Sequence, residues 1–407
     1  MDKKTDAPVI ETKPKTSRLE RLVNRFGWRM TPVNRRRLER FKAHKLGYRS
    51  FQIFMVLFLV TLFAEFIAND RPLVAMYKGE LLFPVLVDYP EEKFGGFLAV
   101  TDYRTPEIAN EISANGWMIW PLIRYSYDTI NKDYPGRMGS NGVCLGYPAP
   151  PPWARVLPWA AGLPLCEAPP DQIARYQTLG NTNWLGLDNQ GRDVVARIIY
   201  GFRISVLFGL LLTIVSSIIG VLAGAVQGYF GGWTDLIFQR VLEIWNSIPE
   251  LFVLLIISSL FVPGFWTLLG ILLLFSWTSL VGLVRAEFLR GRNLEYVRAA
   301  RALGLTDWQI MFKHLLPNAM VATLTFLPFK LSSGIGLLTA LDFLGLGMPP
   351  GSPSLGELLL QGKQHLEAPW LGISGFISVS IILSLAVFIG EAVRDALDPR
   401  KTFRQSR

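Results

Sequence analysis

Six long apolar stretches divide the chain. An α-helix needs about 20 predominantly apolar residues to cross the hydrocarbon core of a bilayer. Windows of about that length select residues 51–68, 203–227, 236–262, 266–288, 318–342 and 373–393. The third stretch contains Arg240, Glu243 and Glu250, and its more apolar half follows Pro249. The pattern predicts an all-α membrane protein with six transmembrane helices.

The basic residues predict an orientation for these helices. Lysine and arginine are concentrated in residues 1–50, 289–317 and 394–407. Positively charged flanks are retained on the cytoplasmic side, and an even number of spans puts both termini together. The predicted order is a basic cytoplasmic tail over 1–50, a first transmembrane helix over 51–68, a loop or cap outside the cytoplasm over 69–200, a five-helix core over 201–394 and a cytoplasmic C-terminus over 395–407.

Composition supports a membrane protein and argues against nucleic-acid binding. The chain is 50% hydrophobic and only 18% charged, whereas soluble domains have about 25% charged residues. The formal net charge is +9, but residues 1–50 alone hold 15 Lys/Arg and 5 Asp/Glu. The stretch 35–45 therefore favours a polybasic anchor at anionic headgroups. The N-terminus lacks the features of a cleaved signal peptide, so 51–68 is expected to remain as an anchor.

The long segment 69–200 has 11 Lys/Arg and 14 Asp/Glu and is rich in Pro, Trp and Tyr. Its stretch YPAPPPWARVLPWAAGLPLCEAPP favours irregular, proline-braced structure over helices. The segment also contains both cysteines of the chain, Cys144 and Cys166. They form a disulfide, or they are two unpaired thiols. No CxxC or HExxH motif is present, so no metal site is expected.

Four polar residues lie within the apolar stretches: Glu243, Asn246, Glu250 and Lys330. A charge at the bilayer centre costs at least about 2.5–3.5 kcal/mol. Glu243 and Glu250 are seven residues apart, with Asn246 between them, so a continuous helix would place all three on one face. We expect that face to line a wet path or to contact a partner subunit, and Lys330 is a further candidate for the translocation path. Alternatively, Glu243 lies near the headgroups and Lys330 pairs with an acid in a structural role.

The second stretch carries small residues at intervals of four: Ser216, Gly220, Gly224 and Gly228. Such a face lets another helix approach closely. The alternative is that glycine is simply frequent in membrane helices.

Segment 289–317 contains EYVRAARALGLTDWQIMFKHLLPN from residue 295 onward. Gly304 is expected to end a first helix, Thr306 to cap a second, and Pro317 to open the fifth span. The first helix is too polar to span a membrane and too apolar for a solvated linker. We expect its apolar side chains to dock into a groove on another protein. These are Tyr296, Val297, Ala299, Ala300, Leu303 and Leu305.

This segment resembles the EAA signature of inner-membrane permease subunits of ABC importers. The matching positions are Ala299, Ala300, Gly304, Leu316 and Pro317. Arg298 stands where the signature has its acid, with Glu295 nearby, and His314 replaces the aliphatic residue before LP. The longer form, YVRAARALG with KHLLPN, resembles the dipeptide/oligopeptide branch of this family.

Further blocks resemble the same branch. They are NWLGLDNQGRDVVARIIYGFRIS at 183–205, GYFGGWTDLIFQR at 228–240, LDFLGLGMPPGSPSLGELL at 341–359 and EAVRDALDPR at 391–400. The resemblance covers about 183–400. Within the branch, the first third, including FAEFIANDRPL at 63–73, is most similar to Yej-type importers of microcin C and peptides.

The resemblance implies a type I importer permease fold in a bacterial inner membrane. It implies a second, non-identical permease, a periplasmic substrate-binding protein and ABC ATPases that carry ATP and Mg²⁺. The sequence contains no GxxxxGK[ST], and its only Gly-Lys pair, Gly362-Lys363, is followed by Gln364. A phosphate-binding loop is therefore absent, and this chain is expected to bind no cofactor and to be no enzyme. The implied ATPase-coupling residues are Glu295, Tyr296, Val297, Arg298, Ala299, Ala300, Leu303, Gly304, Leu305 and Asp307.

Two other functions fit parts of the pattern. An ion-coupled carrier working alone would use Glu243, Glu250 and Lys330 as coupling groups. A membrane scaffold would display 69–200 and would need no docking helix in segment 289–317. The sequence leaves the substrate open.

Overall fold

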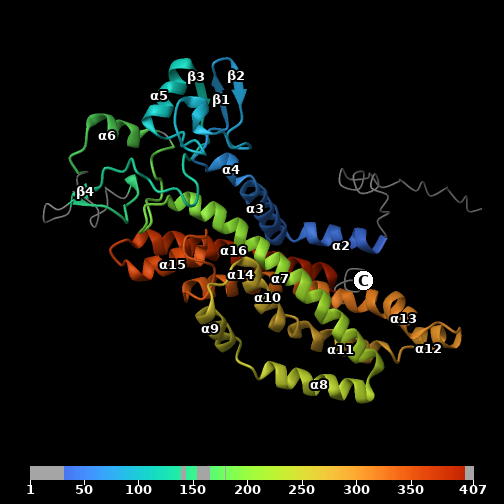
Figure 1. Cartoon of the computed structure of the whole chain (residues 1–407). Helices are drawn as coiled ribbons and strands as arrows, with labels where there is room; N and C mark the ends of the chain where they lie inside the picture. The colour runs from blue at the N-terminus through green and yellow to red at the C-terminus, as the bar shows by residue number, and fades with distance from the viewer. Residues whose placement is uncertain (1–31, 139–143, 154–165, 179, 399–407) are drawn as a thin grey trace, which may run out of the picture.

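The computed structural model describes residues 32–138, 144–153, 166–178 and 180–398. Most of the predicted basic tail, part of the proline-rich stretch and the last residues of the C-terminus lie outside these ranges. Long helices form one bundle, and the segment before α7 forms a separate lobe at one end of it (Figure 1).

The bundle contains the predicted spans. Its long helices are α3 (Lys45–Leu62), α7 (Val194–Phe230), α10 (Phe265–Ser276) with α11 (Thr278–Gly291), α14 (Leu316–Phe343) and α16 (Pro369–Leu397). In the described chain five helices are long and apolar enough to cross a membrane, and α8 (Gly232–Asn246) with α9 (Glu250–Leu260) supplies a sixth when the bent pair counts as one span. The prediction of six spans is confirmed on this count.

The small-residue face of α7 packs against α11. A Cβ atom built on Gly220, Gly224 or Gly228 would lie only 2.5, 2.7 or 2.6 Å from a backbone oxygen of α11 or of its N-cap residue. These oxygens belong to Trp277, Val281 and Arg285. Both series repeat every four residues, so the two backbones touch along one seam. The prediction of a close helix–helix contact at this face is confirmed.

Two spans begin earlier than predicted. Helix α3 starts at Lys45 instead of residue 51, and α2 (Pro32–Ala43) precedes it, so part of the predicted tail is helical. Helix α7 starts at Val194 instead of 203, because the Asp193 side chain accepts a hydrogen bond from the amide of Ala196 at 2.8 Å and caps the helix there. A search for apolar windows does not detect the ends of helices when those ends consist of polar residues.

The lobe before α7 is more regular than predicted. Strands β1 (Val74–Tyr77), β2 (Glu80–Leu82) and β3 (Gly116–Ile119) form an antiparallel sheet in the order β2-β1-β3, covered by η1 (Glu91–Phe94) and α5 (Pro106–Asn115). Lys78 and Gly79 join β1 to β2 with positive φ angles of 47° and 87°. Two such residues form the tight turn that matches the twist of a hairpin. The sequence VAMY-KG-ELL carried this signal, and the irregular-structure prediction overlooked it.

The rest of the lobe contains little regular structure. It consists of α4 (Ala64–Ile67), β4 (Arg137–Met138), β5 (Cys144–Leu145) and α6 (Pro170–Gln177), joined by turns and extended segments. For these described residues, the prediction of mainly irregular backbone holds.

The cysteines lie beside the same short strand. Cys166 is disulfide-bonded, and its amide donates to the carbonyl of Gly136 at 3.3 Å, whereas the backbone of Cys144 pairs with Met138. Cys144 is the only other cysteine in the sequence, and its side chain lies outside the description. We predict that both thiols resist maleimide until a reductant is added. Rapid labelling of untreated protein would contradict the bridge.

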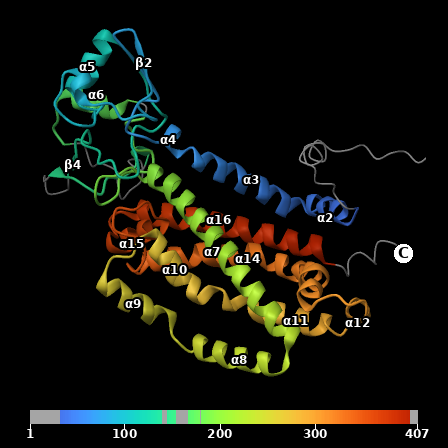
Figure 2. The same ribbon diagram turned by 45° about the vertical axis from the view of Figure 1, so that its right-hand side comes forward.

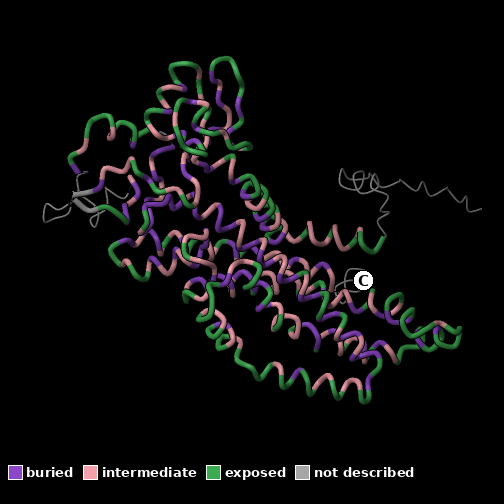
Figure 3. Tube along the Cα trace, viewed as in Figure 1, coloured by how far each residue is buried: buried purple, intermediate pink, exposed green. Residues whose placement is uncertain are grey.

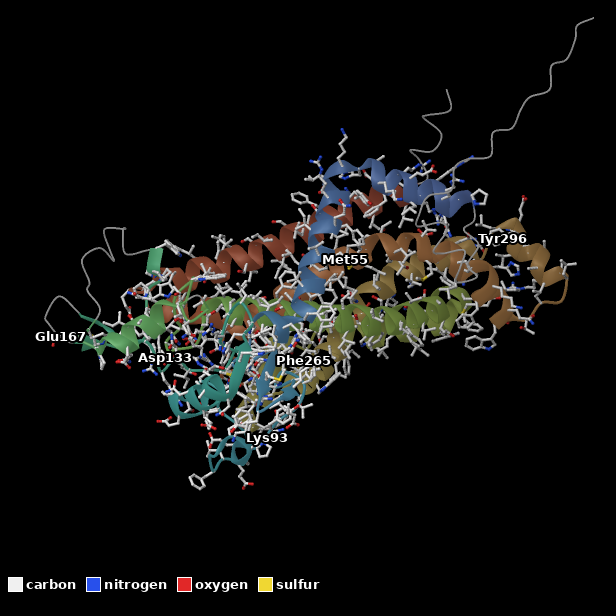
Figure 4. All side chains as sticks on the ribbon, turned by 90° about the horizontal axis from the view of Figure 1, so that it is seen from above. Met55, Lys93, Asp133, Glu167, Phe265 and Tyr296 are labelled. Carbon is white, nitrogen blue, oxygen red and sulfur yellow. The ribbon has the colours of Figure 1, made fainter. Side chains whose placement is uncertain are left out.

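The lobe and segment 289–317 lie at opposite ends of the bundle. In Figure 2 the lobe is at the N-terminal end of α7, whereas α12 (Glu295–Ala302) projects beyond its C-terminal end. Figure 4 shows the same separation between Asp133 of the lobe and Tyr296 of α12. Helix α2 packs on α16, whose last turn lies at the α12 end. The three predicted basic segments therefore share one end in their described parts.

Candidate functional site

Helix α12 ends in a tight backbone turn at Gly304. The φ angle of Gly304 is +79°, and its amide donates to the carbonyl of Arg301 at 3.0 Å. The next amide, of Leu305, donates to the carbonyl of Ala300 at 3.2 Å. This pair of bonds is a Schellman motif, which favours glycine at the left-handed position. The predicted helix end is confirmed.

A second helix starts at once. The Thr306 hydroxyl accepts from the amide of Gln309, and the side-chain oxygen of Gln309 accepts in turn from the amide of Thr306. This capping box begins α13 (Asp307–Gln309), as predicted. Pro317 lies in the first turn of α14, as predicted, but helical backbone also precedes it. Helix continues from α13 through the π-helical η3 (Ile310–Leu315) into α14. Pro317 lacks an amide donor, and a widened turn precedes it.

One face of α12 belongs to the protein's own core. Val297 is 1% exposed and Ala300 is 6% exposed, and they pack with side chains from α7, α11, η3 and α14. Leu305 packs against the same cluster. These three residues were predicted to be part of a docking surface, and this assignment was wrong. A helix of this length can project from the bundle only if some of its apolar residues anchor it.

The opposite face of α12 is open. Leu303 is 81% exposed and Tyr296 is 39% exposed, and Ala299 is also exposed. In Figure 3 the trace at this end of the bundle is largely coloured as exposed. Glu295 and Arg298 are exposed on the same helix. Beyond the turn, the rings of Trp308 and Phe312 stack with centroids 5.7 Å apart and are also exposed. We call the exposed residues of this set the α12 surface: Glu295, Tyr296, Arg298, Ala299, Leu303, Trp308 and Phe312.

A polar cluster ties the α12 surface to the end of α7. The Tyr229 hydroxyl donates to Oδ1 of Asp307 at 2.5 Å and accepts from Nη2 of Arg301 at 3.2 Å. Arg292 donates from Nη1 to the carbonyl of Tyr229 at 3.3 Å. Asp307, predicted to take part in ATPase coupling, binds Tyr229 and keeps a side chain that is 54% exposed, so its coupling role stays a prediction. Sequence reasoning missed Tyr229, which is 72 residues from Arg301.

The three polar residues of the predicted third span do not share one helical face. Helices α8 and α9 meet at a 57° bend, which puts Glu243 and Asn246 on one helix and Glu250 on the other. Pro249 lies in the break and cannot donate a helical hydrogen bond. Oε2 of Glu243 pairs with Nη1 of Arg240 at 2.6 Å, with both side chains exposed. The one-face prediction was wrong.

Lys330 lies near the middle of α14 and has neutral partners. Its Nζ donates to the carbonyl of Ser276 at 2.8 Å and to Oγ of Ser279 at 2.9 Å. Among the described residues no carboxylate forms an ion pair with it. The alternative that it pairs structurally with an acid of this chain is wrong for the described part.

A buried charge cluster lies near the N-terminal end of α7. Oδ2 of Asp188 accepts from Nε of Arg192 at 2.7 Å and lies 3.6 Å from Nε of Arg197. Glu357, on α15 (Leu355–Gln364), binds Arg192 at 3.1 Å and Arg197 at 2.6 Å. The side chains of Asp188 and Arg197 are 0% exposed. Two blocks of the family resemblance, 183–205 and 341–359, thus meet here. The sequence showed that both blocks resemble the family, but it did not predict that they contact each other.

Asp193, beside this cluster, is almost completely buried. Burial raises the pKa of its carboxyl to about 6, although hydrogen bonds from Ala196 and Asn183 favour the charged form. In the described part of the chain, no group of three His, Cys, Asp or Glu residues is arranged to hold a metal ion. The ion pairs of Glu357 with Arg192 and Arg197 join two segments of the fold.

Comparison with known proteins supports a transport role. A model of the family "Binding-protein-dependent transport system inner membrane component" matches residues 216–403. The peptidoglycan transport system permease protein YejE of Agrobacterium fabrum is 63% identical over 92% of this chain and 95% of that protein. The inner membrane ABC transporter permease protein YejE of Escherichia coli K12 is 52% identical over 92% of this chain and 99% of that protein.

A more distant relative is the oligopeptide transport system permease protein OppC of Lactococcus lactis IL1403. It is 32% identical over 56% of this chain and 78% of that protein. Together with the bundle, these matches define a multi-pass membrane subunit of an ABC transporter. The chain belongs to the family of binding-protein-dependent transport system inner membrane components.

Membership sets the class of activity. The chain is a permease subunit with the type I importer fold, and hydrolysis of ATP belongs to a separate ATPase subunit. An ATPase and a substrate-binding protein are the partners that such permeases have. A carrier that works alone under an ion gradient is not favoured.

Proposed function

We propose that this chain is one permease half of an importer for peptides or peptide-like compounds, such as microcin C or peptidoglycan fragments. The observation that carries the proposal is the α12 surface, exposed on one side and anchored by Val297 and Ala300 on the other. The names of the relatives, which specify peptidoglycan and oligopeptide transport, support the substrate class.

The anchoring of α12 provides a way for movement of an ATPase to be transmitted to the membrane-spanning helices. Val297 and Ala300 pack with side chains of α7, α11 and α14, and Tyr229 holds Asp307 to the end of α7. Packed interiors transmit displacement because they contain few voids. When ATP binding draws two ATPases together, α12 moves, and these spans move with it. The path then changes from inward- to outward-facing.

The second permease subunit fits beside α8 and α9. Most apolar side chains of these helices are exposed, and only Leu242 and Leu254 are buried within this chain. They also lie apart from the main bundle in Figure 2. We assign this face to a non-identical permease, with lipid on its outer side. The end that carries α12 faces the cytoplasm with both termini, and the lobe faces the periplasm.

Reconstitution tests the proposal. In proteoliposomes, the chain with its second permease, ATPase and binding protein is expected to take up labelled peptide only with ATP and Mg²⁺. The chain alone is expected to remain inactive under a proton or sodium gradient. Gradient-driven uptake by the isolated chain would contradict the proposal and support the carrier.

A further inference from the structure

The amine of Lys330 lies at a kink between two helices. It donates to the carbonyl of Ser276, the last residue of α10, and to the hydroxyl of Ser279, in the first turn of α11. A cation at the C-terminal end of a helix is favourable, because the carbonyls there carry partial negative charge. The kink therefore fixes the position of the amine.

These contacts leave the ammonium group incompletely satisfied. Lysine has three N–H donors and a full positive charge, and the two acceptors of Lys330, the Ser276 carbonyl and the Ser279 hydroxyl, are neutral. A charge inside a membrane normally pairs with an opposite charge or faces a water-filled cavity. Among the described residues, no carboxylate forms an ion pair with Lys330. One donor and the charge are thus available to a group from outside this chain.

The surroundings of Lys330 are polar and accessible. Ser279 on α11 and Ser333, one turn after Lys330 on α14, are both exposed in this chain. Helix α8 reaches the same kink, because Nε1 of Trp245 donates to the carbonyl of Leu274 at 2.8 Å. Helix α8 belongs to the face that we assign to the second permease. The hydroxyls and the amine therefore lie beside the space between the two permeases.

We propose that Lys330, with Ser279, forms a transit site that binds the carboxylate of a substrate as it crosses the membrane. This inference rests on the proposed function and narrows the substrate class to compounds with a free carboxylate, such as the C-terminus of a peptide. A charge-assisted hydrogen bond from an ammonium to a carboxylate is stronger than a neutral one. The neutral partners hold the amine in place without neutralising it, so the carboxylate can leave again.

A matched pair of peptides tests the site. The complete transporter in proteoliposomes is given trialanine or trialanine amide, which differ only at the C-terminal carboxylate. We expect Lys330→Gln to lower ATP-dependent uptake of trialanine about tenfold, the effect of one charged hydrogen bond. Uptake of the amide is expected to change less than about twofold. Lys330→Arg keeps the charge and is expected to retain most uptake of trialanine.

Lys363→Gln provides a matched control. Lys363 is an exposed lysine on α15 that lies over the ring of Phe343, outside the proposed site. The Lys363→Gln variant is expected to leave the ratio of trialanine uptake to trialanine amide uptake unchanged. An equal loss of both peptides in Lys330→Gln would overturn the transit site and assign the amine to an acid of the second permease. No loss of either would also overturn it.

Failure of the proposed function gives a different result. In that case the unmodified transporter shows no ATP-dependent uptake of either peptide. If the unmodified complex transports both peptides and only the Lys330 variants behave contrary to expectation, the importer assignment stands and the transit site fails.

Discussion

Replacement of Asp188 by leucine is expected to prevent stable folding of this protein. Asp188 accepts hydrogen bonds from Arg192, and Arg197 lies beside it in a site without solvent access. Removing one partner of a buried ion pair costs about 3–5 kcal/mol, because the other charge remains buried. Here two guanidinium groups would share only Glu357. We expect a large decrease in thermal stability in detergent and in membrane abundance.

A second Asp–Arg pair supplies the control for Asp188. Asp171 and Arg175 have the same four-residue spacing and lie 3.3 Å apart, but both side chains are exposed. Exposed pairs contribute about 0–1 kcal/mol, so Asp171→Leu is expected to have almost no effect. If Asp188→Leu fails to fold, combination with Arg192→Met, Arg197→Met and Glu357→Gln should restore stability, because these uncharged replacements leave no buried charge. Equal stability of the two single variants would contradict the buried-charge explanation.

The membrane-spanning helices and the contact between α7 and α11 were predictable from local sequence patterns. Apolar length predicted the helices, and the four-residue spacing from Gly220 to Gly228 predicted the close approach of α7 and α11. The turn at Gly304 was also predictable, because the Schellman motif is made by residues within five positions of one another. Local rules of periodicity and capping specify such features almost completely.

Features formed by distant residues were not predictable in this way. Arg192 and Glu357 are separated by 165 residues, and a single sequence gives no signal that they meet. The bend at Pro249 was missed for a different reason. The sequence shows the proline, but the prediction treated residues 243–250 as one continuous helix. The burial of Val297 was missed because an amphipathic pattern does not say which partner covers the apolar side. For Val297 and Ala300 that partner is the protein itself, whereas Tyr296 and Leu303 stay exposed.

Replacement of Gly304 by valine is expected to uncouple transport from ATP hydrolysis. The φ angle of +79° is strained for any residue with a Cβ atom, and most strained for a β-branched one. The strain disfavours the turn that carries the bond from Leu305 to Ala300, and with it the angle between α12 and α13. A left-handed residue costs about 1–2 kcal/mol. We therefore expect ATP-dependent uptake to fall about tenfold, while the ATPase still hydrolyses ATP.

Asparagine at position 304 separates backbone strain from bulk. Asparagine is similar in size to valine but tolerates the left-handed conformation. A Cβ atom at position 304 would meet nothing within 4 Å in this chain, so neither substitution causes an internal clash. Gly304→Asn is therefore expected to keep most uptake, measured together with copurification of the ATPase. If asparagine and valine impair uptake equally, the added bulk disturbs the docked ATPase, and the backbone turn is not the element that transmits its motion.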